Sequence, residues 1–280
     1  MRKSPNKEIE RYLRTGEHDQ YYSAWPGNSF LDRANHGDAA LTRALVAEVL
    51  RRTQHAAGPE VRVDLDVVAL TRAKVAPMVL GLFPRHEQKS VLELLERSVV
   101  FLMHSNIATV LAQTRWPMTV WTLANLYLES LGVGLLSDDA PRLVGLSEET
   151  ICYVSMEYFR ANDRFADFVV HEAAHIFHNC KRRTIGLRET RRREWLLQIE
   201  FTKRETFAYA CEAYSRILVL STGPADRQRL LSRLEEGPMP EERVDADEYL
   251  DILREAVAAR NGWKRILERC SSPSTRALPT

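Results

Sequence analysis

One short stretch, residues 169–177, restricts the possible folds most strongly, because it surrounds three polar side chains with apolar neighbours. Its sequence is Val-Val-His-Glu-Ala-Ala-His-Ile-Phe, so His171, Glu172 and His175 stand among aliphatic and aromatic residues. With about 3.6 residues per helical turn, His171 and His175 share one face of a helix and Glu172 lies beside that face. Burying two imidazoles and a carboxylate is costly unless they have partners. We therefore predict a helix in the middle of a domain, with a single polar face that lines a site.

The remainder of the chain also favours helices. Its 280 residues include 12 Gly and 12 Pro, about 9% together against roughly 12% in average proteins, so few turns are available. Helical spacing of apolar residues or helix-capping signals predict helices at 38–55, 65–82 (with a kink at Pro77), 91–113, 117–131, 163–180, 202–220, 225–234 and 246–267. A short strand is predicted at 150–157, where β-branched and aromatic residues gather. Residues 195–201 form either a second short strand or the lead into a helix.

The start of three predicted helices rests on local capping signals. Asn162 or Asp163 can cap the helix that carries His171. Ser90 with Glu93, and Thr202 with Glu205, have the spacing of a capping box, in which each residue binds the backbone N–H of the other.

These elements predict a mainly α (α+β) fold with four consecutive regions. Residues 1–37 form an N-terminal extension and 38–145 a helical region that ends in a connection rich in Gly and Asp. Residues 146–270 combine a small β-sheet with the helix at 171–175, and the polar tail 271–280 is expected to be disordered.

Composition and targeting signals narrow the cellular context. The four cysteines are widely scattered, which predicts free thiols and a reducing compartment. Residues 1–20 lack the apolar run of a secretory signal, and no apolar stretch is long enough to span a bilayer. We expect a cytoplasmic protein without membrane contact; its oligomeric state is left open.

His171, Glu172 and His175 form the pattern H-E-x-x-H, which is typical of zinc hydrolases. Two imidazoles four residues apart can bind one Zn²⁺ from a single helical face. A carboxylate beside them can accept a proton from the water that the metal activates and pass it to a leaving group. The motif therefore predicts a zinc site with Glu172 as the general base.

This segment resembles the zincin metallopeptidases over about a quarter of the chain, from Ile151 to Leu218. The resemblance implies a strand before the motif helix, here Ile151–Glu157, whose edge pairs with an extended substrate. It also implies a third metal ligand after that helix. The longer H-E-x-x-H-x-x-G-x-x-H motif of metzincins is absent, which points to the gluzincin branch. Peptide deformylases share the motif, but their Cys-bearing ligand motif has no counterpart around Cys152.

Several downstream residues compete for the third ligand position. Glu205-Thr206-Phe207-Ala208 is similar to the E-x-F-A of several gluzincins, so Glu205 is the preferred ligand and Glu212 the alternative. These two lie seven residues apart, nearly on one helical face, so one can bind metal while the other orients a ligand or contacts substrate. The remaining candidates are Glu194, Glu200 and His178.

Three residues are possible substrate or oxyanion contacts, namely Tyr209, Glu212 and His178. For His178 the simpler interpretation is a helix-terminal imidazole that interacts with the helix dipole. His171 and His175 themselves can also be structural, bonding to backbone in a packed helix.

Charge is distributed unevenly even though the net charge is +1. Residues 181–204 hold nine basic and three acidic side chains, including Arg191, Arg192 and Arg193, whereas residues 235–251 hold eight acidic side chains and one Arg. The basic segment can attract a nucleic-acid backbone or an acidic substrate. We favour the interpretation that it is a solvated loop balanced by the acidic segment.

These observations predict an intracellular zinc-dependent metallopeptidase that cleaves a peptide or protein substrate. Two alternatives remain. One is a metal-binding, nucleic-acid-associated or mobile-element accessory protein that acts through residues 181–204. The other is a degenerate zincin that serves as an interaction module.

Overall fold

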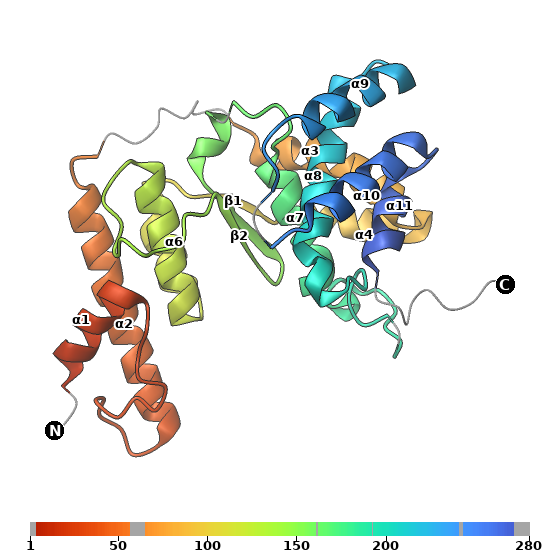
Figure 1. The fold of residues 1–280 in the computed structure, drawn as a ribbon. Coiled ribbons are helices and arrows are strands. Elements are labelled where there is room, and N and C mark those ends of the chain that lie inside the picture. The colour runs from red at the N-terminus through yellow and green to blue at the C-terminus, as the bar shows by residue number, and fades with distance from the viewer. Residues whose placement is uncertain (1–3, 57–64, 161, 192, 241–242, 272–280) are drawn as a thin grey trace. The chain divides into compact units, whose positions relative to one another are not determined.

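The computed structural model describes residues 4–56, 65–160, 162–191, 193–240 and 243–271. Eleven α-helices and a three-stranded sheet are present in this part of the chain, which confirms the prediction of a mainly helical fold with a small β component (Figure 1). Residues 272–280 of the predicted tail lie outside the described residues. Among the described helices, none combines the length and apolar character that crossing a bilayer requires.

The chain forms two compact units built from interleaved segments, rather than from consecutive ranges such as 38–145 and 146–270. The first unit takes the described residues within 1–61, 101–144 and 155–157, and the second takes the remainder. The helices of the first unit are α1 (Pro5–Thr15), α2 (Phe30–Thr53), α5 (Ile107–Gln113) and α6 (Pro117–Ser130). Those of the second are α3 (Val67–Leu82), α4 (Arg85–Leu95), α7 (Phe168–Asn179), α8 (Arg204–Leu220), α9 (Pro224–Glu235), α10 (Ala246–Ala258) and α11 (Gly262–Cys270).

The first unit begins earlier than the sequence predicted, because α1 and the start of α2 lie within residues 1–37. The helix expected at 38–55 starts at Phe30, where Ser29 and Asp32 form a capping box. The Ser29 hydroxyl accepts from the Asp32 N–H, and the Asp32 carboxylate accepts from the Ser29 N–H. This reciprocal pair satisfies two N–H groups that would otherwise lack partners, so the helix begins there.

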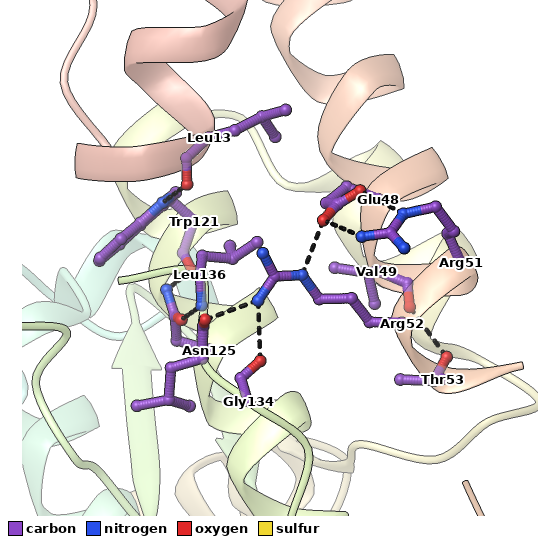
Figure 2. A network of polar contacts seen from close by, with 11 residues as sticks. Leu13, Glu48, Val49, Arg51, Arg52, Thr53, Trp121, Asn125, Gly134 and Leu136 are labelled. Carbon is purple, nitrogen blue, oxygen red and sulfur yellow. Dashed lines mark hydrogen bonds and ion pairs between the residues drawn. The ribbon is translucent and has the colours of Figure 1, made fainter. Parts of the chain in front are cut away.

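Polar contacts hold the segment after α6 to the helices of the first unit (Figure 2). Arg52 on α2 donates to Glu48 and to the carbonyl oxygens of Gly134 and Leu135 in the segment after α6. The side-chain oxygen of Asn125 on α6 accepts from the Leu136 N–H at 2.8 Å. Irregular backbone after α6 is therefore held by side chains of regular elements.

In the segment predicted as one long helix, residues 91–113, the chain instead forms the end of α4, strand β1 (Val99–Phe101) and α5. The predicted cap at Ser90 and Glu93 is wrong, since α4 begins at Arg85 directly after Pro84 and Ser90 lies inside it. The helix ends at Leu95, and three residues later the Ser98 carbonyl accepts from the Cys152 N–H at 2.7 Å, so the chain continues into the sheet. A sheet contact between two residues more than fifty positions apart in the sequence thus overrides the local helical periodicity.

The sheet has the strand order β1-β3-β2, which places β3 (Ile151–Val154) in the centre. β2 (Gly145–Glu148) pairs antiparallel with β3, Gly145 opposite Val154 and Glu148 opposite Ile151. The strand predicted at 150–157 is confirmed only for residues 151–154, since a 3₁₀ turn begins at Met156, and both edges of this strand are occupied by β1 and β2. The expectation that Ile151–Glu157 offers a free edge to a substrate is therefore wrong.

Helix α7 packs against β2 and β3 on one side and against α8 on another, and α8 in turn contacts α10 and α11 (Figure 1). The helix expected from Asn162 or Asp163 begins only at Phe168, with Asp167 as its N-cap residue. Asp167 uses its carboxylate elsewhere, since it accepts from Lys74 Nζ at 2.6 Å and from the Tyr158 hydroxyl at 3.3 Å. These contacts fix the backbone at the N-terminal end of α7.

The C-terminal helices differ from the sequence expectation at two points. Residues 246–267 form α10 and α11 rather than one helix, because Asn261 caps α11 and also donates to the Gly81 carbonyl on α3. Residues 195–201 form only isolated bridges, including Lys181 with Trp195, before a short 3₁₀ turn, Phe201–Lys203, leads into α8. The predicted capping box of Thr202 and Glu205 is absent, since α8 has no side-chain cap.

Candidate metal site

Helix α7 is buried along almost its whole length, as its apolar sequence predicts. Every residue from 169 to 178 is buried, His171, Glu172 and His175 included. Ala173 on α7 and Ala208 on α8 are both fully buried. Since α7 and α8 pack directly against each other, small side chains on both helices allow the polar residues between them to meet.

The two motif histidines and Glu205 converge on one point. The Nε2 atoms of His171 and His175 are 3.2 Å apart. Glu205 Oε2 lies 3.5 Å from the Nε2 of His175 and 3.8 Å from the Nε2 of His171. Their ligand-type atoms all lie within 4.8 Å of one another. Glu205 lies in the first turn of α8 with its carboxylate directed at the imidazoles, not at the helix backbone, which explains why the predicted capping box does not form.

Glu212 contacts the other ring nitrogen of His171. Its Oε2 is 3.1 Å from His171 Nδ1, and its Oε1 accepts from the Asp167 N–H at 2.6 Å. Burial lowers the pKa of His171, but the hydrogen bond and negative charge of Glu212 outweigh burial and raise this pKa to about 9. The seven-residue spacing therefore places Glu205 and Glu212 at opposite nitrogens of the same imidazole, and only Glu205 joins the convergent cluster.

His178 lies behind His175, with its Nε2 3.3 Å from His175 Nδ1. It is 4% exposed, and its Nδ1 has no hydrogen-bond partner among the described residues. Burial, together with the nearby His175 and Arg204, lowers the pKa of His178 to about 3. This imidazole is placed to orient His175 and lies on the side of the ring away from the cluster.

Tyr209 stands one turn along α8 from Glu205 and is half-buried. Its ring meets the His171 ring edge to face, with centroids 4.5 Å apart.

The other two candidate ligands, Glu194 and Glu200, are not part of the His171, His175 and Glu205 cluster. Glu194 forms an ion pair with Lys181 at 2.6 Å, and Glu200 accepts from the Thr202 hydroxyl.

Glu172 occupies a tightly enclosed position between α7 and the sheet. It is 6% exposed, and Gly145 at the start of β2 lies against it, so that a β-carbon at Gly145 would be 2.5 Å from Glu172 Oε1. Burial raises the pKa of Glu172, while His171 and His175 act to lower this pKa. Gly145 permits the strand to pass directly over the carboxylate. In the sequence, Gly145 is one of the glycines that mark the irregular connection after the helical region, and its contact with Glu172 is not apparent there.

Glu205 has a second partner that the sequence did not single out. Its Oε1 lies 3.5 Å from Nη1 of Arg243, the residue that stands shortly before α10. The hydrogen bond from His175 lowers the pKa of Glu205 to about 2, and Arg243 acts in the same direction. Arg243 is the only basic residue within 235–251. This isolated position in an acidic segment is the sequence signal that could have indicated a specific role for it.

The basic segment 181–204 is partly folded into the protein instead of forming the solvated loop that was expected. Arg182 is buried, forms an ion pair with buried Glu87 on α4 and donates from Nε to the Arg188 carbonyl. Lys203 pairs with Glu248, an acidic residue of α10, at 2.5 Å. Arg192 lies outside the described residues. Part of the positive charge is thus neutralised within the chain.

All four cysteines are buried as thiols outside any disulfide, in agreement with the prediction from their scattered positions. Comparison of the chain with protein-family models, curated proteins and solved structures found no match.

Proposed function

We propose that this protein is a zinc-dependent hydrolase of gluzincin type, most simply a metallopeptidase. The observation that carries the proposal is the convergence of His171 Nε2, His175 Nε2 and Glu205 Oε2, with the buried Glu172 close enough to interact electrostatically with both histidines. Side chains that are costly to bury are brought together here from two helices, and a bound cation would compensate that cost.

The spacing of the cluster fits zinc. Ligand bonds of about 2.0–2.2 Å in a tetrahedron place neighbouring ligand atoms about 3.3–3.6 Å apart. The observed separations among the three atoms are 3.2, 3.5 and 3.8 Å. The carboxylate of Glu212 on His171 Nδ1 supplies the outer partner that metal-binding histidines usually have. His171, His175 and Glu205 would therefore hold the ion, leaving a fourth position open.

Each neighbouring side chain then has a distinct task. Zinc in this position would lower the pKa of a water towards neutrality and polarise a carbonyl oxygen. Glu172 would accept the proton of the attacking water on a carboxylate oxygen and deliver it to the leaving nitrogen. Its raised pKa suits a group that must both take and release a proton. Tyr209, whose ring adjoins His171, would contact the substrate or its developing oxyanion.

An extended peptide would bind along β2. Among the described strands β2 stands at an edge of the sheet, whereas β3 is central, and Gly145 brings β2 next to Glu172. A peptide added to this edge would form backbone hydrogen bonds that are largely independent of its sequence. The four free thiols are typical of a reducing compartment, so we propose an intracellular, cytoplasmic activity.

The proposal is tested first by metal analysis and then by one substitution. We expect the full chain to bind about one equivalent of zinc tightly, and Glu172→Gln to retain zinc while losing hydrolysis of peptide libraries by about 10²-fold or more. His175→Ala should lose both zinc binding and hydrolysis. A chain that binds no zinc, or a Glu172→Gln protein with undiminished hydrolysis, would refute the proposed function.

A further inference from the structure

The carboxylate of Glu205 divides its two oxygens between different partners. Oε2 faces the Nε2 atoms of His171 and His175, whereas Oε1 faces Arg243 Nη1 at 3.5 Å. A metal ligated through Oε2 would therefore leave Oε1 to the guanidinium. Arg243 is consequently the cation that stands next to the proposed reaction centre, on the side of Glu205 away from the imidazoles.

The position of Arg243 is fixed by the residues that follow it. Val244 is buried, and the side chain of Asp245 caps α10 by accepting from the Glu248 N–H at 2.9 Å. Helix α10 packs against α8, the helix that begins with Arg204 and Glu205. The backbone at residues 243–245 is therefore held against the same helix that presents Glu205.

The ion pair between Arg243 and Glu205 is too exposed to serve mainly for stability. Its side chain is 65% exposed, against 26% for Glu205, and an ion pair this accessible to water contributes little to stability. A guanidinium carries five N–H donors in a planar fork that matches a carboxylate. Arg243 already has contacts of its own, the one with Glu205 among them, so an anion arriving from solvent would exchange with these partners at an exposed guanidinium beside the metal ligand.

We propose that Arg243 is a specificity-determining residue that binds a substrate carboxylate close to the scissile bond. This inference rests on the proposed hydrolase function and adds a substrate class to it, peptides with a free carboxylate next to the cleaved bond. The carboxylate belongs either to the C-terminus of a peptide or to an acidic side chain. The guanidinium holds it while Glu172 acts on the neighbouring peptide group.

The first experiment measures binding, not catalysis. The probes are the monohydroxamate of succinic acid, whose hydroxamate anchors on zinc, and its neutral primary amide, titrated calorimetrically into the zinc-loaded full chain. We expect the acid to bind about fivefold more tightly than the amide. Arg243→Gln should abolish this preference. Arg265→Gln should keep it, because Arg265 is an exposed arginine of α11 paired with Glu268 at 2.8 Å.

Equal affinity for both probes in the wild-type chain would overturn the proposal, as would a preference that survives Arg243→Gln. Zinc affinity of each variant is measured by chelator competition. Loss of zinc affinity in Arg243→Gln with the preference intact would show that Arg243 only supports Glu205. Failure of the chain to bind zinc at all refutes the hydrolase itself, whereas a zinc-loaded chain without preference refutes only the role of Arg243.

A second experiment identifies the source of the carboxylate. Zinc-loaded Glu172→Gln protein, which should not cleave peptides, is titrated with acetylated trialanine and its C-terminal amide. It is also titrated with amidated peptides that carry a central glutamate or glutamine. A preference for the free C-terminus assigns a carboxypeptidase-like substrate, and a preference for glutamate assigns an acidic side chain. A preference for neither contradicts the proposal.

Discussion

Glu212 Oε2 lies 3.1 Å from Nδ1 of His171, so the carboxylate holds the imidazole from the side opposite its Nε2. When His171 is neutral, as a metal ligand must be, this contact favours the tautomer with hydrogen on Nδ1, which leaves the Nε2 lone pair on the side of His175 and Glu205. The second oxygen of Glu212 accepts from the Asp167 N–H, which ties the same carboxylate to the N-terminus of α7. One side chain thereby fixes both the rotation of His171 and the start of the helix that carries it.

Glu212→Ala should weaken zinc binding about 10- to 100-fold, because the orientation of His171 is lost while all three ligands remain. Glu205→Ala should weaken it further, since a ligand is removed. Glu200→Ala, a change to a glutamate outside the cluster, is the control. Affinities come from chelator competition. If Glu212→Ala proves more damaging than Glu205→Ala, the ligand assignment must be exchanged.

Gly145→Ala should impair hydrolysis without removing the metal. The added β-carbon would lie 2.5 Å from Glu172 Oε1 and 2.7 Å from its Cγ, so the carboxylate or strand β2 must shift. Because a small misplacement of a catalytic group is costly, we expect kcat to fall about 10²-fold. Gly134→Ala is a matched control, as its β-carbon would meet nothing within 4 Å. Zinc content and kcat are measured for both, and unchanged kcat in Gly145→Ala would show that Glu172 is not positioned by this contact.

The burial of α7 and several helix ends could be predicted because their determinants are local. Apolar residues around His171 and His175 require a buried helix, and Pro84 and Pro117 limit the neighbouring helices through their backbone geometry. In such segments the nearest residues in sequence decide the structure, so pattern and propensity are sufficient.

Features that depend on distant contacts could not be predicted. Residues 91–113 have helical periodicity, yet Ser98 pairs with Cys152 and the helix stops. Glu205 and Glu212 share a helical face, and only the packing of α8 on α7 decides which reaches the Nε2 atoms. Gly145 looks like a turn residue in the sequence. Its close approach to Glu172 becomes visible only when β2 crosses α7.

The first unit should show a specific acid sensitivity at Glu48 (Figure 2). The hydrogen bond from Arg51, together with that from Arg52, lowers the pKa of Glu48 from its usual 4.5 to about 2, although partial burial acts to raise this pKa. Because the pKa is lower in the folded state, the stabilisation is complete above pH 4.5 and is lost as the pH falls towards 2.

Glu48→Gln should therefore be less stable than the wild type at pH 6 by about 1 kcal/mol, a value reduced for solvent screening of the ion pairs. This difference should shrink as the pH falls from 4.5 to 2. Urea unfolding of both proteins at pH 6 and pH 3 measures it, with Glu10→Gln, an exposed glutamate on α1, as the control. A difference independent of pH would contradict the ionic origin.

The last prediction concerns Arg182, the buried arginine of the basic segment. Arg182 and Glu87 are 2% and 4% exposed and form an ion pair, so removing one partner leaves the other charge buried and poorly compensated. We expect Arg182→Met to lower the free energy of unfolding by about 3–5 kcal/mol. The double variant Arg182→Met, Glu87→Leu should recover most of this loss, because both charges are then gone. Arg183→Met, a change to the exposed neighbour of Arg182, should have little effect. Urea unfolding followed by circular dichroism measures all four proteins, and equal stability of Arg182→Met and Arg183→Met would show that the segment is not anchored through Arg182.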